Sequence, residues 1–159
     1  MANEDVFGGA KLMITFWFAY QNAVAQAVGT ERAIALQTKT SESIGARQGK
    51  MLKEQSGIKE FDAKTALPLI KNLKGSIGMR YEIVEESPQR VVIRNMTCPY
   101  YEAALTLGMD AKAIETCCRT GPMRIADSIV KPLNPKLNIN VRKFRSNQSD
   151  FCDEEVYLG

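Results

Sequence analysis

The residues of this chain that could do chemistry are four cysteines, and none of its 159 residues is a histidine. Without histidine, neither a Ser-His-Asp triad nor a Cys-His pair can form within one chain. Zinc sites that use histidine, such as HExxH or Cys₂His₂, are excluded for the same reason. A nucleophile in this protein must therefore be activated without an imidazole, and a metal would need Cys, Asp, Glu or backbone oxygen as ligands.

Cys98 is the strongest candidate nucleophile. It follows a predicted strand and precedes Pro99, a residue typical of the first turn of a helix. The unpaired N–H groups and the positive dipole end of such a helix favour a thiolate, so we expect a lowered pKa at Cys98. Glu102, four residues later, could lie beside Cys98 on one helix face and act as the base. The alternative is that Cys98 is a small buried hydrophobic residue at a strand end.

The other three cysteines follow in the second half of the chain. Cys117 and Cys118 are neighbours on a predicted helix and should point about 100° apart, so we expect one to face the core and one a pocket. Cys152 lies early in the last predicted strand. The spacings match no zinc ribbon or ferredoxin motif. A folded cluster of Cys98, Cys117, Cys118 and Cys152 that holds zinc or an iron–sulfur cluster is the alternative to thiol chemistry.

Polar residues near the cysteines are the candidate substrate-binding groups. Tyr100, Tyr101 and Arg119 could orient a carboxylate or amide, and Arg119 could bind a carboxylate through two hydrogen bonds. Cys118 is a second candidate for moving a proton, beside Glu102.

The charge pattern argues against nucleic acid as a partner. Lys and Arg exceed Asp and Glu by only three residues, 21 against 18. The densest basic stretch, which contains Lys136, Arg142, Lys143 and Arg145, is followed at once by Asp150, Asp153, Glu154 and Glu155. We interpret this as a solvated pair of strands and not a phosphate-binding groove.

The most apolar stretch, residues 12–20, is too short to span a bilayer, which needs about 20 apolar residues. Acidic Glu4 and Asp5 precede it, which does not fit a signal peptide. We therefore expect a cytoplasmic protein with no membrane partner and with reduced thiols. The aromatic residues of this stretch could form a homodimer face.

The elements that would position the cysteines predict an α+β fold. Helices are expected over residues 10–28, about 31–55 with Thr30 as its N-cap, and 63–75 with Asp62 as its N-cap. Ser41, Gly45 and Gly49 lie four residues apart and form a ridge of small residues. We expect another helix to pack closely against that ridge.

The second half changes to a strand pattern. Strands are expected at 79–86 and 90–96, helices at 100–107, 110–118 and 122–130, and strands at 137–144 and 151–158, with Pro132 and Pro135 ending the last helix. The two hairpins would form one antiparallel sheet with short helices inserted between them. The length predicts one domain over 1–159, with a helical half at about 10–75 and an α+β half at about 79–159.

Several short motifs resemble one known family. They are Cys98-Pro99-Tyr100, Leu107-Gly108, a cysteine at 117 or 118, Asn134-Pro135 and Ser149-Asp150-Phe151-Cys152, with Phe16-Trp17, residues 29–33 and Gly45 in the helical half. Together they cover most of the chain. They resemble the L-2-amino-thiazoline-4-carboxylic acid hydrolase-like proteins and, more loosely, the 4-vinyl reductase-like ligand-binding superfamily.

The resemblance implies an α+β domain with a ligand pocket between sheet and helices. It also implies a hydrolase that opens a cyclic amidine-like thiazoline, with Cys98, Cys117 or Cys118, and Cys152 lining the site and Asp150 beside it. In this interpretation Cys98 attacks a C=N or amide-like carbon, and Glu102 or Cys118 moves the proton. The alternative is a non-catalytic domain that binds a small ligand, zinc or an iron–sulfur cluster through the cysteines.

Overall fold

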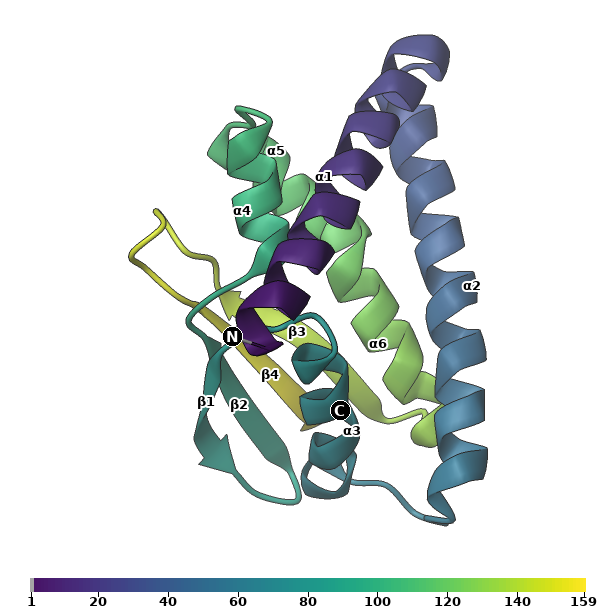
Figure 1. Cartoon of the computed structure of the whole chain (residues 1–159). Coiled ribbons are helices and arrows are strands. Elements are labelled where there is room, and N and C mark those ends of the chain that lie inside the picture. The colour runs from purple at the N-terminus through teal and green to yellow at the C-terminus, as the bar shows by residue number, and fades with distance from the viewer. Residues whose placement is uncertain (1) are drawn as a thin grey trace.

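The helices and strands follow the order that the sequence predicts (Figure 1). The computed structural model describes residues 2–159, with side chains from residue 4 onward. Its elements are α1 (Ala2–Val28), α2 (Thr30–Ser56), α3 (Ala63–Gly75), β1 (Tyr81–Glu86), β2 (Arg90–Asn95), α4 (Pro99–Thr106), α5 (Ala111–Thr120), α6 (Pro122–Leu133), β3 (Leu137–Lys143) and β4 (Cys152–Leu158). The α+β prediction is confirmed: a helical first half is followed by two hairpins that share one antiparallel sheet.

Several predicted helix ends are wrong by a residue or more, and α1 begins at Ala2, eight residues before its predicted start. Gly29, and not Thr30, caps α2, since its φ of 88° is a conformation that glycine adopts without strain. α6 continues through Pro132 to Leu133. The N–H of Asn134 bonds to the Val130 carbonyl at 3.0 Å and completes the last turn. Burial of Leu133, which is 2% exposed, offsets the hydrogen bond that the proline cannot make.

Aspartate side chains cap two other helices. Asp62 accepts a hydrogen bond from the Thr65 N–H at 2.7 Å, and the Thr65 hydroxyl accepts one from the Asp62 N–H, which forms a capping box. Asp110, predicted as the first residue of its helix, is instead the N-cap of α5 and accepts one hydrogen bond from the Ala113 N–H at 2.8 Å.

The sheet has the order β1-β2-β4-β3, and β2 and β4 join the two hairpins. In this pairing Asn95 lies opposite Cys152, and Ile93 lies opposite Glu154. Because alternate residues of a strand share a face, Asn95, Cys152 and Glu154 lie on one face with Ile93 and Val156. Helices α3 and α6 cover this inner face (Figure 1).

Two groups of buried side chains form the core. The larger lies between the sheet and helices α3 and α6, and includes Leu67, Ile70, Val91, Ile93, Val130, Leu133, Leu137 and Val156. The smaller lies where α1 packs on α4 and α5, and contains Ile14, Phe18, Ala103, Ala104 and Ile114.

The ridge of small residues on α2 packs directly on α6, as predicted. A Cβ added to Gly45 would lie 2.5 Å from the carbonyl oxygen of Ile125, and one added to Gly49 would lie 2.2 Å from that of Ile129. The two backbones are therefore in contact. α6 is held between α2 and the sheet (Figure 1).

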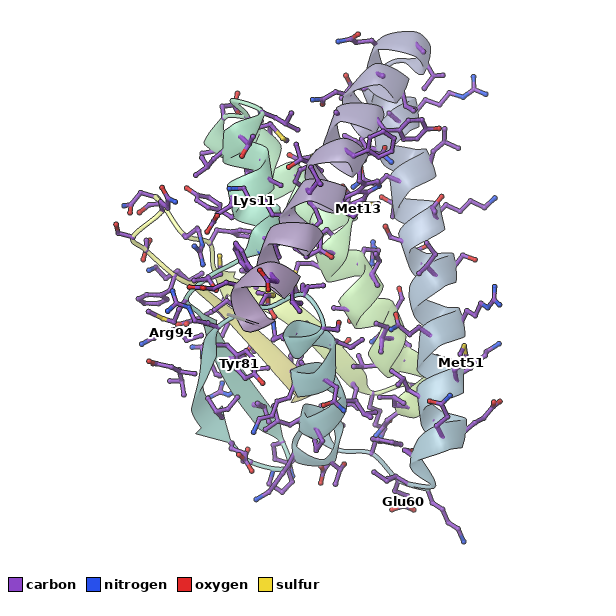
Figure 2. All side chains as sticks on the ribbon, viewed as in Figure 1. Lys11, Met13, Met51, Glu60, Tyr81 and Arg94 are labelled. Atoms are coloured by element: carbon purple, nitrogen blue, oxygen red, sulfur yellow. The ribbon has the colours of Figure 1, made fainter. Side chains whose placement is uncertain are left out.

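Large apolar side chains on α1 stay outside the core. Leu12, Met13, Phe16 and Tyr20 are between 58% and 70% exposed, because Ile14 and Phe18 form the buried face instead. Met13, labelled in Figure 2, belongs to this exposed stripe. The homodimer expected from these residues stays a prediction. Within residues 2–159, no helix is long and apolar enough to cross a bilayer.

The contact between α2 and α6 gives a test of the fold. Gly49→Ala should lower the free energy of unfolding by about 1–3 kcal/mol in urea denaturation, because the new methyl group meets a backbone carbonyl that cannot rotate away. Gly9→Ala is the matched control: nothing lies within 4 Å of its Cβ position, so the better helix propensity of alanine should raise stability by up to about 1 kcal/mol. Equal effects of the two substitutions would contradict the close approach.

Candidate functional site

A cavity of about 230 Å³ lies between the inner face of the sheet and helices α3 and α6, where α4 and α5 also contribute to its wall. Most of its wall is apolar. The apolar lining includes Ile70 and Leu73 from α3, Ile125 and Ile129 from α6, and Ile139 and Val141 from β3.

Three of the four cysteines line this cavity. Cys98 comes from the junction of β2 and α4, Cys118 from α5 and Cys152 from β4, and Tyr100 lies beside them. Cys117 is not a lining residue and packs against the smaller core cluster. The structure therefore brings together thiols that lie far apart in the sequence, and it places Cys118, not its neighbour, in the wall.

Cys98 has the predicted position but not the predicted ionisation. It is the N-cap residue of α4, with Pro99 in the first turn. Burial nevertheless raises the pKa of the Cys98 thiol to about 11, against the opposing influence of the Tyr101 N–H and the Arg145 guanidinium. The expectation of a lowered pKa is wrong, because loss of hydration outweighs the helix N-terminus.

Neighbouring groups in the wall are also neutral at neutral pH. Burial raises the pKa of the Cys118 thiol well above its usual range, and nearby Cys98 and Cys152 raise it further. Burial raises the pKa of the Tyr100 hydroxyl to about 12. Any reaction of Cys98 therefore starts from a thiol and needs a group that accepts its proton.

Glu102 does not lie where a base for Cys98 would be needed. Its carboxylate pairs with the ammonium of Lys11 on α1 at 3.3 Å, and Figure 2 shows Lys11 pointing toward α4. Glu102 is not among the residues that line the cavity. Glu102 does lie one helix turn after Cys98, since its N–H bonds to the Cys98 carbonyl at 3.1 Å, but its carboxylate holds α1 and does not reach the cavity wall.

Only one of the predicted substrate-binding residues lies in the cavity wall. Of the four, Tyr100 lines the cavity, whereas Tyr101, Arg119 and Asp150 do not. Arg119 bonds to Glu115 one turn earlier on α5 and lies over the ring of Phe144. Tyr101 lies under the guanidinium of Arg145, 5.0 Å from its ring centre.

Asp150 has a structural contact of its own in the turn between β3 and β4. Its carboxylate accepts hydrogen bonds from Lys143 and Ser146. The hydrogen bond from Lys143 holds the pKa of Asp150 well below its usual range. The Asp150 carboxylate therefore binds groups around the turn and lies outside the cavity wall.

A hydrogen-bonded group of three polar residues in the wall was not predicted from the sequence. Lys74 from α3 donates a hydrogen bond to Asn95 Oδ1 at 3.0 Å and a charge-assisted one to Glu154 Oε2. All three line the cavity. The Nδ2 of Asn95, which is 1% exposed, has no hydrogen-bond partner among the residues described.

The sequence did contain a signal for two of these residues. Lys74 continues the apolar stripe of Leu67 and Ile70 at helical spacing, and Glu154 alternates with Cys152 and Val156. A charged residue at a core-facing position is unusual, and it therefore marks a place where a buried polar group has a role. The interpretation of this stretch as fully solvated is wrong for Glu154 and also for Arg145, which is 8% exposed.

No metal site of the predicted kind is found among the described residues. Across residues 2–159, no group of three or more Cys, Asp or Glu side chains is arranged to hold a metal ion. A structural zinc site needs four such ligands around one point. Because Cys117 lies outside the cavity wall, the adjacent cysteines do not serve one centre.

The fold and the site define an α+β protein with an internal cavity lined by thiols. The family model described as L-2-amino-thiazoline-4-carboxylic acid hydrolase matches residues 10–154, and the chain belongs to this family. The resemblance of the short motifs is thereby confirmed. A comparison with curated protein sequences gave no match.

Among solved structures, the chain is similar to trafficking protein particle complex subunit 3 from Naegleria fowleri, a structure in which that protein is covalently bound to palmitic acid. The similarity covers 95% of both chains with a TM-score of 0.58 and 12% sequence identity. At this identity the two proteins share a fold.

The raised pKa of Cys98 predicts how stability depends on pH. The folded state holds the thiol proton more tightly than the unfolded state, so the stabilisation is fully present below the ordinary pKa of 9.0 and is lost as pH rises toward about 11. The free energy of unfolding, measured in urea across this window, should therefore fall with pH. The slope should be shallower in Cys98→Ala. An unchanged slope in that variant would show that Cys98 titrates normally.

Proposed function

We propose that this protein is a thiol-dependent hydrolase that opens a compact cyclic substrate at a C=N-containing amidine carbon, with Cys98 as the nucleophile. The observation that carries the proposal is a single cavity that brings the Cys98 thiol and a carboxylate, Glu154, to one largely apolar space. Membership of the L-2-amino-thiazoline-4-carboxylic acid hydrolase family supports a substrate of that class.

The volume of the cavity suits such a substrate. A cavity of roughly 150 Å³ in a protein core binds benzene, which has six ring carbons. On the same scale, 230 Å³ holds about nine non-hydrogen atoms. That is the size of a five-membered thiazoline ring with one amino and one carboxylate substituent.

The neutral state of Cys98 determines the order of proton transfers. The thiol proton passes to the basic amidine nitrogen of the substrate, through Glu154, as the Cys98 sulfur forms a bond to the amidine carbon. The ring C–S bond then breaks, and the ring sulfur leaves as a thiol. Water adds to the same carbon, and cleavage of its bond to Cys98 restores the protein thiol. Glu154 takes the role for which Glu102 is misplaced, because Glu154 lines the cavity.

Removal of the nucleophile tests this proposal. Cys98→Ala should lower kcat for hydrolysis of L-2-amino-thiazoline-4-carboxylate by at least about a thousandfold, since the covalent step is lost. The matched control is Cys117→Ala, which removes a thiol that does not line the cavity and should leave kcat within about twofold. Wild-type turnover in Cys98→Ala would exclude Cys98 as the nucleophile.

A second candidate function is binding of an apolar ligand without turnover. The raised pKa values of Cys98 and Cys118 favour it, because both thiols are weak nucleophiles at neutral pH. The shared fold with a protein covalently bound to palmitic acid also favours it. However, palmitic acid has roughly twice as many non-hydrogen atoms as this cavity accommodates.

Native mass spectrometry of the purified protein, together with a turnover assay, separates the two functions. The hydrolase should have the mass of its sequence and should turn over the thiazoline. A binding protein should carry an added ligand mass that is lost on denaturation, should keep that mass in Cys98→Ala, and should not turn over the thiazoline. A retained ligand without turnover would therefore contradict the hydrolase.

A further inference from the structure

The polar end of the cavity contains a buried hydrogen-bond donor without an acceptor. Asn95 is 1% exposed and lines the cavity, and its Oδ1 accepts from Lys74 at 3.0 Å. Its Nδ2 has no partner in the part of the chain that the structure describes. Buried amide groups are nearly always paired, so an acceptor atom in the cavity would complete this site.

Lys74 provides a second donor at the same place. Its ammonium group has three N–H bonds, and two of them point to Asn95 Oδ1 and Glu154 Oε2. No third acceptor is present among the described side chains and carbonyls. Because Lys74 is bonded to Asn95 and both line the cavity, the ammonium and the amide are neighbours in its wall.

The buried charges around this end do not balance. Arg145 is 8% exposed, and its guanidinium donates to the carbonyl oxygens of Asn95 and Met96, at 2.8 Å and 3.3 Å. No carboxylate among residues 2–159 forms an ion pair with it. Lys74 pairs with Glu154. The Arg145 guanidinium, in contrast, bonds to carbonyl oxygens and lies over the ring of Tyr101, so among the described residues one buried positive charge has no carboxylate partner. Buried charges require such partners, so an anion is the complementary ligand.

We propose that Lys74 and Asn95 form a carboxylate subsite that orients the substrate in the cavity. One carboxylate group would accept hydrogen bonds from both donors and would neutralise the excess positive charge. The body of the ligand would then extend into the part of the cavity that Cys98 and Cys118 line. This inference rests on the proposed function in taking the cavity as the substrate site. It defines the ligand class as small organic acids, and it makes Lys74 and Asn95 determinants of specificity.

Asn95→Asp is the sharpest test. The substitution keeps the shape of the side chain and the acceptor for Lys74. It replaces the free amide donor by a carboxylate oxygen, which supplies from the protein the negative charge that the ligand would otherwise bring. The variant should therefore fold with a Tm at least equal to that of its parent.

Binding should be measured by calorimetry in a Cys98→Ala parent, in which turnover does not interfere. The two probes are L-2-amino-thiazoline-4-carboxylate and 2-amino-thiazoline, which lacks the carboxylate. We expect the parent to bind the carboxylate probe at least about tenfold more tightly than the decarboxylated one. Asn95→Asp should weaken binding of the carboxylate probe by at least about tenfold and should not weaken binding of the other.

The matched control is Asn140→Asp, which makes the same change at an exposed position of β3 outside the cavity. It should keep the parent's affinities within about twofold. The inference is overturned if the parent does not prefer the carboxylate probe, if it binds neither probe, or if Asn95→Asp binds the carboxylate probe like the parent. Full turnover in Cys98→Ala, with the carboxylate preference intact, would instead refute the nucleophile and leave the subsite standing.

Discussion

The contact between the backbones of α2 and α6 is the constraint on which the site depends. Gly45 and Gly49 let the Ile125 and Ile129 carbonyls approach so closely that no side chain fits between the helices. α6 is thereby held against α2 on one side, while its other side packs on β3 and forms much of the cavity wall. Helix interiors rarely keep glycine, because it costs about 1 kcal/mol in helix propensity. Here that cost is offset by the packing that positions α6 over the sheet.

Enclosure by α3, α6 and the sheet also controls the chemistry of the thiols. A helix N-terminus stabilises an anion by about 0.3–1 kcal/mol, and by up to about 2 kcal/mol in partly buried sites. The shift of the Cys98 pKa from 9.0 to about 11 corresponds to roughly 3 kcal/mol in the opposite direction. Desolvation therefore decides the ionisation of Cys98. In the proposed hydrolase, Cys98 would stay protonated until a basic substrate accepts the proton.

The cavity has two chemically different parts. Thiols and apolar side chains form one, and the network of Lys74, Asn95 and Glu154 forms the other. A polar network in a low-dielectric interior is favourable only when its members are satisfied, and the Nδ2 of Asn95 is not. A hydrogen-bond donor left unpaired on a cavity wall is a group that a ligand in the cavity could pair with. A carboxylate bound to Lys74 and Asn95 would give the rest of the acid one orientation in the cavity.

Local signals in the sequence determined much of the fold. Asp62 and Asp110 start helices because their side chains accept N–H groups three residues later, and Ser41, Gly45 and Gly49 mark the close helix contact by their spacing alone. The absence of histidine by itself excluded imidazole as a base, as an activator of a nucleophile and as a metal ligand. The short motifs around Cys98 and Cys152 indicated the family.

Only the tertiary structure decided which residues meet. The pairing of β2 with β4 places Asn95 opposite Cys152, and this register joins residues more than fifty positions apart that no local pattern connects. The tertiary structure also decided which glutamate lies near the thiols, since Glu102 pairs with α1 whereas Glu154 lines the cavity. The pKa of Cys98 was mispredicted because the helix position is a local property. Desolvation, in contrast, depends on all the segments that fold around the thiol and exclude water from it.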